Sequence, residues 1–250
     1  MKYQRDYSRQ FPKVKDLASR QRKAIKILQV LKEFWGRERL TGLLCLDMGC
    51  SVGVVSDVLA RDGAQVIGLD IDEDALTQRA SPRELAFGFV VGDVDAAPFP
   101  DGSFDIIVCA QVYEHAPDLS LLVEEIARLL KTGGVCFFSG PNRWAIMEEH
   151  YAISFLSWLP RRWADWIVRR SGRGTEYYEQ PRSAQELRRA LQRFTIRDLL
   201  PDLLAHSERY AMEHEVGNLK YLAPWVPRRG WSCLGVIVPN FNWLMIKAEA

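Results

Sequence analysis

A glycine-containing loop that follows a carboxylate is the first feature of this sequence that could carry chemistry. In the run LLCLDMGCSVGVVS, Asp47 ends an apolar segment, and Gly49, Ser51 and Gly53 follow at alternate positions before a helical pattern begins. Small residues let the backbone approach a ligand closely, and the N-terminus of the next helix favours negatively charged groups. Several nucleotide-binding folds use such a loop, so it does not by itself choose between cofactors.

Two further carboxylates end later apolar segments. Asp70 ends VIGLD, where a carboxylate suits the two hydroxyls of a ribose because it can accept both hydrogen bonds. Asp93 ends VVGD, where it can accept a hydrogen bond from the exocyclic amine of adenine. A helix cap or a turn explains either residue alone, but Asp70 and Asp93 in register with Asp47 make three carboxylates, which favour a nucleoside site.

Two histidines are the catalytic candidates. His115 follows the fourth apolar segment and is the first candidate for a general base, although an orienting histidine bonded to the backbone is an equal alternative. His150 follows Glu148 and Glu149 at the start of a segment that could reach over the pocket. A surface loop explains His150 as well.

Short apolar runs alternate with helical patterns around these residues, which is typical of a parallel sheet covered by helices. Strands are predicted at 43–47, 65–70, 87–91, 104–110, 135–139 and from 240 onward, with helices at 13–40, 54–61, 73–80 and 119–130. A further helix is predicted at 183–194, opened by the S-x-x-E pattern of a capping box. No element is predicted between 198 and 230.

Residues 151–170 interrupt this alternation and are rich in Trp and Arg. Pro160 divides the segment, so two short helices fit it better than a strand. A helix pair packed on the core is one interpretation. The other is an interfacial segment, from Tyr151 to Arg170, that makes peripheral contact with a membrane surface or a lipid acceptor.

Composition and charge limit the class of protein. The chain has 250 residues, 48% of them hydrophobic and 26% charged, as in an ordinary soluble globular protein. Residues 41–140 contain 5 Lys and Arg against 16 Asp and Glu, which argues against nucleic acid lying across the site. Five cysteines without a C-x-x-C pair, no signal peptide and no apolar run of about 18 residues predict a cytoplasmic protein with no transmembrane segment.

Four motifs occur in the order that one family shows: LDMGCSVG, VIGLDID, GDVDAAPFPDGSFDIIVCAQVYEHAPD and LLKTGGVCFFSGPN. Through them, residues 41–140 resemble a class I S-adenosylmethionine-dependent methyltransferase, of the branch that includes the ubiquinone and menaquinone biosynthesis methyltransferases. Ser51 stands where the first motif usually has a glycine. The resemblance implies S-adenosyl-L-methionine as the cofactor, with these binding candidates: Asp47, Gly49, Cys50, Ser51, Gly53, Asp70, Ile71, Asp93, Val94 and Gln111.

The resemblance also implies a fold and a division of the chain. We expect an α/β fold: a Rossmann-like, doubly wound, mostly parallel seven-stranded sheet with an antiparallel final strand and a helical insertion after the fifth strand. The expected parts are an N-terminal amphipathic helical segment (1–40), the S-adenosylmethionine-binding core (41–141), a helical cap or insertion (142–182) and the C-terminal part of the methyltransferase domain (183–250).

The expected function is methyl transfer, with O-methylation of a small-molecule or a lipid- or sugar-linked acceptor. In the quinone O-methyltransferases, a Glu, Glu, His set at the spacing of Gln111, Glu114 and His115 is associated with a magnesium ion. Because Gln111 removes one anionic ligand, no metal is expected here. Two alternatives stay open: an NAD-dependent oxidoreductase, which Asp93 and the missing third glycine argue against, and a catalytically silent S-adenosylmethionine-binding protein.

Overall fold

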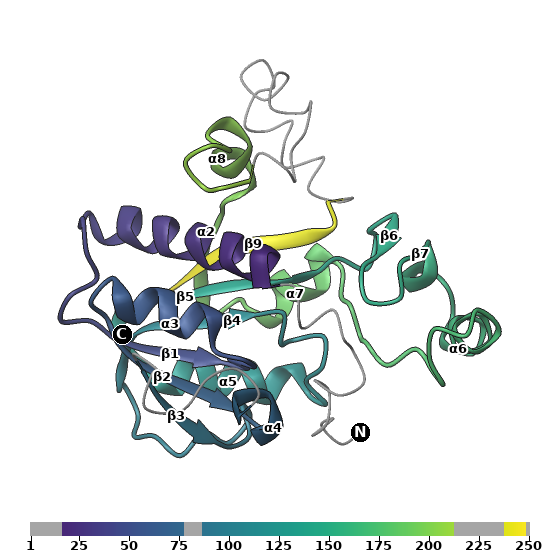
Figure 1. Cartoon of the computed structure of the whole chain (residues 1–250), viewed down its shortest axis with the longest axis horizontal. Helices are drawn as coiled ribbons and strands as arrows, with labels where there is room; N and C mark the ends of the chain where they lie inside the picture. The colour runs from purple at the N-terminus through teal and green to yellow at the C-terminus, as the bar shows by residue number, and fades with distance from the viewer. Residues whose placement is uncertain (1–16, 78–86, 213–237, 249–250) are drawn as a thin grey trace.

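The structure, a computed structural model of the chain, describes residues 17–77, 87–212 and 238–248 (Figure 1). Its centre is a seven-stranded sheet with the strand order β3-β2-β1-β4-β5-β9-β8. In chain order its strands are β1 (Leu44–Met48), β2 (Gln65–Asp70), β3 (Gly88–Val91), β4 (Phe104–Ala110), β5 (Leu130–Pro141), β8 (Phe194–Asp198) and β9 (Asn240–Lys247).

Six strands of the sheet point the same way and β9 points the other way. β1 pairs in parallel with β2 and β4, β2 with β3, and β4 with β5. β9 lies between β5 and β8 and is antiparallel to both. This arrangement confirms the predicted α/β fold class, with its mostly parallel seven-stranded sheet and antiparallel final strand.

The strand order reverses at β1. The chain passes from β1 outward to β2 and β3, and then returns to place β4 on the other side of β1. The carboxyl ends of β1 and β4 are therefore neighbours, and the helices that follow these two strands cover opposite faces of the sheet. In open parallel sheets, ligands bind in the crevice at such a reversal.

Alternating side chains of the strands form two core layers. Ile106 and Val108 of β4 pack on the face covered by α2 (Leu17–Trp35), α3 (Val54–Arg61) and α8 (Leu200–Ala205). Ile107 and Cys109 pack on the other face, which α5 (Leu119–Leu129) and α7 (Ala184–Ala190) cover. Because both faces are covered, the central strands are apolar on both sides, as their continuous apolar runs predict.

Several predicted boundaries agree with the structure. β2, β4 and α3 have the predicted limits, and β1, β3 and α5 differ by one residue at one or both ends. The S-x-x-E pattern forms a capping box, in which the Ser183 hydroxyl accepts from the Glu186 amide and the Glu186 carboxylate accepts from the Ser183 amide. Helix α4 (Glu73–Thr77) covers the described part of the helix predicted at 73–80.

Two local predictions were wrong. Residues 131–134, expected as a loop before the fifth strand, lie inside β5, because an irregularity in the pairing with β4 between Phe104 and Ile106 accommodates the extra residues. The helix predicted at 183–194 ends at Ala190, and Phe194 begins β8, which the sequence did not predict. β8 has only five residues and its burial is partial, so its apolar residues blended into the preceding helical pattern.

An arm follows β5 and projects beyond the sheet (Figure 1). It contains the two-stranded hairpin β6 (Met147–Glu148) and β7 (Ile153–Ser154), the 3-10 turn η3 (Leu156–Trp158) and α6 (Arg161–Arg170). The arm, which we define as residues 144–180, has a small apolar core of its own: Tyr151, Leu156, Ala164, Val168 and Tyr177. The two predicted short helical pieces are confirmed, while the hairpin was not predicted.

None of the helices in the described ranges is both long enough and apolar enough to cross a membrane.

Trp243 is expected to be a main support of the sheet where β9 joins it. Its ring is 1% exposed and lies against Phe138 and Phe241, at centroid distances of 6.3 and 4.8 Å. We expect Trp243→Ala to lower the free energy of unfolding by about 3–5 kcal/mol in denaturant titration, because it leaves a large cavity. The control Trp166→Ala, at a side chain that is 57% exposed, should change it by less than about 0.5 kcal/mol.

Candidate active site

The loop after β1 folds back onto the end of β2. The amides of Gly49 and Cys50 both donate to the Leu69 carbonyl oxygen, at 2.7 and 3.1 Å. Gly49 has φ +69° and Gly53 has φ +70°, in the region that glycine adopts without strain. Ser51 stands where the family motif has a glycine, and it also has a positive φ, of +50°. A serine in this conformation strains the backbone, whereas a glycine would not.

Gly49 also brings the loop against the segment that follows β4. A Cβ atom at Gly49 would lie 2.6 Å from Cγ2 of Val112, which is closer than side chains approach one another. A Cβ atom at Gly53 would collide with the ring of Phe87 in the same way. The loop after β1 and the turn after β4 are therefore in direct contact.

Asp47 fixes the start of this loop. Its side chain is 3% exposed, and its Oδ2 atom accepts a hydrogen bond from the Ser56 hydroxyl of α3 at 2.6 Å. Burial raises the pKa of Asp47 to about 7, against the lowering effect of the Ser56 hydrogen bond. Asp47 thus joins β1 to α3, and its contact with a cofactor stays a prediction.

The structure joins the first two predicted motifs through Asp70. Its Oδ2 atom accepts from the Ser51 amide at 2.6 Å, and its Oδ1 atom accepts from the Asp72 amide at 2.9 Å. Burial raises the pKa of Asp70 in spite of these hydrogen bonds. A carboxylate offers about four lone-pair sites, so both oxygens can still accept from a diol.

The remaining binding candidates lie near the same edge of the sheet. Asp93 follows β3, and its Oδ1 atom accepts from the Asp95 amide at 3.0 Å. Val94 and Cys50 are buried, and Ile71 follows Asp70 directly with an intermediate exposure. These positions agree with a nucleoside site along the ends of β1, β2 and β3, and their roles stay predictions.

Gln111 makes the turn after β4. It has φ +61°, and its amide donates to the Ser139 carbonyl oxygen at 2.8 Å. Its side-chain nitrogen donates to Oδ1 of Asn240 at 3.0 Å, and the Asn240 amide nitrogen donates to Glu149 at 2.8 Å. The side chain of Gln111 is therefore bonded to β9 and not to Glu114 or His115.

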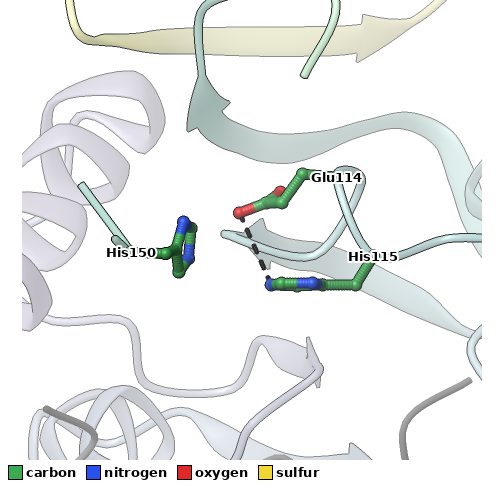
Figure 2. A group of neighbouring side chains, drawn as sticks. All are labelled: Glu114, His115 and His150. Atoms are coloured by element: carbon green, nitrogen blue, oxygen red, sulfur yellow. Dashed lines mark ion pairs between the residues drawn. The ribbon is translucent and has the colours of Figure 1, made fainter. Parts of the chain in front are cut away.

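The two catalytic candidates lie together, although 35 positions separate them. The rings of His115 and His150 meet edge to face with centroids 5.6 Å apart, and Glu114 and His115 point from one turn toward His150 (Figure 2). Nε2 of His115 lies 3.9 Å from Oε1 of Glu114. His150 is held from its other side, because its Nδ1 atom lies 3.0 Å from Oε1 of Glu148.

Two carboxylates in this cluster are buried with few hydrogen-bond donors among the described residues. Glu114 is fully buried and accepts no hydrogen bond from another side chain there, while Glu179 is 1% exposed and has the Tyr151 hydroxyl as its side-chain donor. The Gln180 amide donates to the Glu114 carbonyl oxygen at 2.9 Å, which brings the end of the arm against the turn after β4. A carboxylate buried without a donor is costly, so this cluster is suited to a bound group.

The sequence did not predict that Glu148 and Glu179 belong to the cluster around His115 and His150. Glu148 carried a weak signal, since it lies two residues before His150. Glu179 carried none, because only the folding of the arm brings it to the cluster.

Comparison with known proteins agrees with this geometry. Residues 46–138 match the family model described as Methyltransferase domain. These residues form a methyltransferase domain of the S-adenosylmethionine-dependent class. The matched residues run from β1 to β5 and include the loop after β1, Asp70, Asp93 and the turn that bears Glu114 and His115.

Two curated relatives extend the match. The ubiquinone biosynthesis O-methyltransferase of Methylococcus capsulatus is 32% identical over 140 residues, which cover 54% of this chain and 55% of that protein. The ubiquinone biosynthesis O-methyltransferase of Thiobacillus denitrificans is 34% identical over 158 residues, which cover 61% of this chain and 64% of that protein. The match thus spans less than two thirds of either relative's length.

A solved structure supports the fold of the methyltransferase domain. The S-adenosylmethionine dependent methyltransferase from Mesorhizobium loti superposes with a TM-score of 0.56 at 18% identity, over 83% of this chain and 92% of that one. At this identity the likeness shows that the fold is shared.

The electrostatics of the cluster give the two histidines different charges at pH 7. Burial and, to a smaller extent, the positive charge of His150 together lower the pKa of His115 to about 3, so His115 is neutral at pH 7. Burial also disfavours the charged form of His150, but its bond to Glu148 and the charges of Glu179 and Glu148 raise its pKa to about 9. Burial raises the pKa of Glu114 to about 8, although His150 opposes the shift.

The same side chains meet the distance condition for holding a metal ion. Ligand atoms of Glu114, His115 and His150 lie within 4.8 Å of one another, as do those of Glu148, His150 and Glu179. The pattern associated with magnesium is not reproduced, because Gln111 is bonded elsewhere and two imidazoles are poor ligands for Mg²⁺. The expectation that no metal takes part stays a prediction.

We expect Asp70→Asn to weaken S-adenosylmethionine binding by about 10- to 100-fold in isothermal titration calorimetry, because a charged bidentate acceptor is lost. Asp101→Asn is the matched control, since that side chain is 80% exposed and lies after β3, away from the loop at Gly49. Equal affinities for Asp70→Asn and the wild type, with both proteins folded, would remove Asp70 from the cofactor site.

Glu114 also predicts how stability depends on pH. Its pKa of about 8 in the folded protein lies above the ordinary value of 4.5, so the stability it contributes is complete below about pH 4.5 and is lost as the pH rises through 8. When the pH is raised from 5 to 9, the free energy of unfolding should fall in both proteins, as measured by urea titration. The fall should be smaller in Glu114→Gln than in the wild type, by on the order of 2 kcal/mol. Glu124→Gln, at an exposed position of α5, is the control, and a wild-type pH dependence in Glu114→Gln would contradict the assignment.

Proposed function

We propose that the chain is an enzyme that transfers the methyl group of S-adenosylmethionine to an oxygen atom of a small-molecule acceptor, in particular one that is lipid-linked. The observation that carries the proposal is the cluster of Glu114, His115 and His150, which adjoins the predicted cofactor loop. Val112, which contacts Gly49 of that loop, lies two residues before Glu114 in the same turn. The turn that bears the acid–base cluster is thus in direct contact with the predicted cofactor loop.

Methyl transfer from a sulfonium needs little chemical activation, because the leaving group is neutral once it departs. Most of the rate comes from holding the acceptor atom in line with the methyl group. A hydroxyl acceptor must also lose its proton, and for this a positioned base is needed. The arrangement required is therefore a rigid cofactor loop beside a buried proton acceptor.

The cluster can orient the acceptor hydroxyl and take its proton. His115 is neutral at physiological pH, but its pKa of about 3 makes it a weak base, so its part is to accept a hydrogen bond from the hydroxyl. Glu114 lies 3.9 Å from His115 and has a pKa of about 8, close to the value at which a carboxylate is an effective base near neutral pH. We infer that Glu114 and His115 act as a pair on the acceptor hydroxyl, and that His150, held by Glu148, lines the opposite wall.

The relatives support oxygen as the acceptor atom. Both are described as ubiquinone biosynthesis O-methyltransferases, and the matched part of this chain includes the turn with Glu114 and His115. The arm that contributes His150 and Glu179 lies outside residues 46–138, which match the family model, so the acceptor can differ from that of the relatives.

The test is a panel of hydroxylated aromatic, quinol and lipid-linked compounds incubated with radiolabelled S-adenosylmethionine. We expect label to transfer to oxygen of at least one compound, and Glu114→Gln or His115→Gln to lower kcat by about 10²- to 10⁴-fold while cofactor affinity is kept. His206→Gln is the matched control, because His206 is exposed and follows α8.

Three outcomes would contradict the proposal. If the folded wild type bound NAD and did not bind S-adenosylmethionine, the proposed cofactor would be wrong. Label on nitrogen or carbon alone would replace the acceptor atom. Activity that is lost in EDTA and restored by a divalent cation would make the cluster a metal site and not a base.

A further inference from the structure

The arm exposes an unusual number of apolar side chains. Among the described residues, ten large hydrophobic side chains are exposed, and seven of them lie between residues 144 and 166. Trp163 and Trp166 of α6 are 61 and 57% exposed, and Phe155, Met147 and Ile146 are 46 to 52% exposed. Exposed apolar groups gathered on one part of a surface mark an interaction site, whereas scattered ones are ordinary.

Helix α6 turns its aromatic residues away from the arm's own core. Ala164 and Val168, four positions apart, are fully buried in that core with Tyr151, Leu156 and Tyr177. The exposed residues of α6 follow the other helical face at the spacing i, i+1, i+4, i+7 and i+8: Arg162, Trp163, Trp166, Arg169 and Arg170. The packing that holds α6 in place therefore leaves a complete face of Trp and Arg outward.

The charge of this face is positive. α6 has four arginines, Arg161, Arg162, Arg169 and Arg170, against one acidic residue, Asp165. Asp165 is 3.8 Å from Arg161, and its Oδ1 atom also accepts from the Tyr177 amide, so it is directed toward the arm and not toward the exposed arginines. The surface thus combines tryptophans with a net excess of basic side chains.

We propose that this face of the arm binds the surface of a bilayer containing anionic phospholipids. Trp side chains prefer the boundary between headgroups and acyl chains, and Arg side chains attract acidic headgroups, so an amphipathic helix with both lies in the plane of a membrane. The hairpin and η3 also expose apolar side chains. The hairpin lies between the sheet and α6, and α6 is at the projecting end of the arm in Figure 1. The binding is peripheral, since no described helix can span a bilayer.

The position of this surface relative to the cluster supports a membrane acceptor. His150 lies in the hairpin between β6 and β7, in the arm itself, and its ring is 5.6 Å from that of His115. The element that contacts the bilayer is thus also the element that completes the proposed acceptor site. This inference extends the proposed function, because an acceptor dissolved in the membrane would reach the cluster along the arm.

The experiment is flotation of the full chain with vesicles of phosphatidylcholine, alone or with phosphatidylglycerol. We expect binding to the mixed vesicles that weakens as salt is raised, and a loss of about fivefold in partition coefficient for each of Arg162→Gln and Arg170→Gln. Trp163→Ser with Trp166→Ser should lower binding at least tenfold. The matched controls are Leu121→Ser, at an apolar side chain 49% exposed on α5, and Arg189→Gln, at an exposed position of α7, and neither should change binding.

Circular dichroism and S-adenosylmethionine titration of each variant keep the two proposals separate. Variants of α6 that lose vesicle binding and keep cofactor binding would support the membrane surface whatever the acceptor is. Equal binding of the wild type to neutral and anionic vesicles, or none to either, would overturn the surface proposal. So would a wild-type dimer that the Trp163 and Trp166 changes convert to a monomer, because the face would then be a protein interface.

Discussion

The site depends on a steric constraint at the place where β1 and β4 end side by side. The segments that follow β1 and β4 must leave the sheet there toward opposite faces, although the two strands are direct neighbours. Gly49, Ser51 and Gly53 on one side and Gln111 on the other all have positive φ, which turns each chain sharply. The absence of a Cβ atom at Gly49 lets Val112 pack against the loop. The fit of these two turns brings Glu114 and His115 close to the predicted cofactor loop.

Much of the core could be predicted from the sequence, because strands that are buried on both faces have continuous apolar runs. β2 and β4 were bounded correctly, since turn residues and carboxylates flank them. β8 was missed because five residues with partial burial do not stand out beside an amphipathic helix. The start of β5 was missed because Gly133 and Gly134 indicate a turn, whereas here they lie at an irregularity in a strand pair.

The candidate site could be predicted only in part. Asp47, Asp70 and Asp93 follow strands directly, so the topology of a parallel sheet is enough to bring them to one edge. Glu179 could not be predicted, because its place depends on how the arm folds around Tyr151 and Tyr177 and returns to the turn after β4. Ser51 departs from its family motif and still takes the left-handed conformation, so the geometry of the loop is kept at the cost of strain.

Asn240 gives the site a dependence on the order in which the chain is made. Its side chain accepts from Gln111 and donates to Glu149, so it joins the turn after β4, the last strand and the start of the arm. These segments lie more than 90 positions from Asn240 in the sequence. During synthesis from the N-terminus, the first five strands can pair while this residue is still inside the ribosome. The contact that joins the turn after β4 to the start of the arm is therefore completed after those strands have paired, when residue 240 emerges.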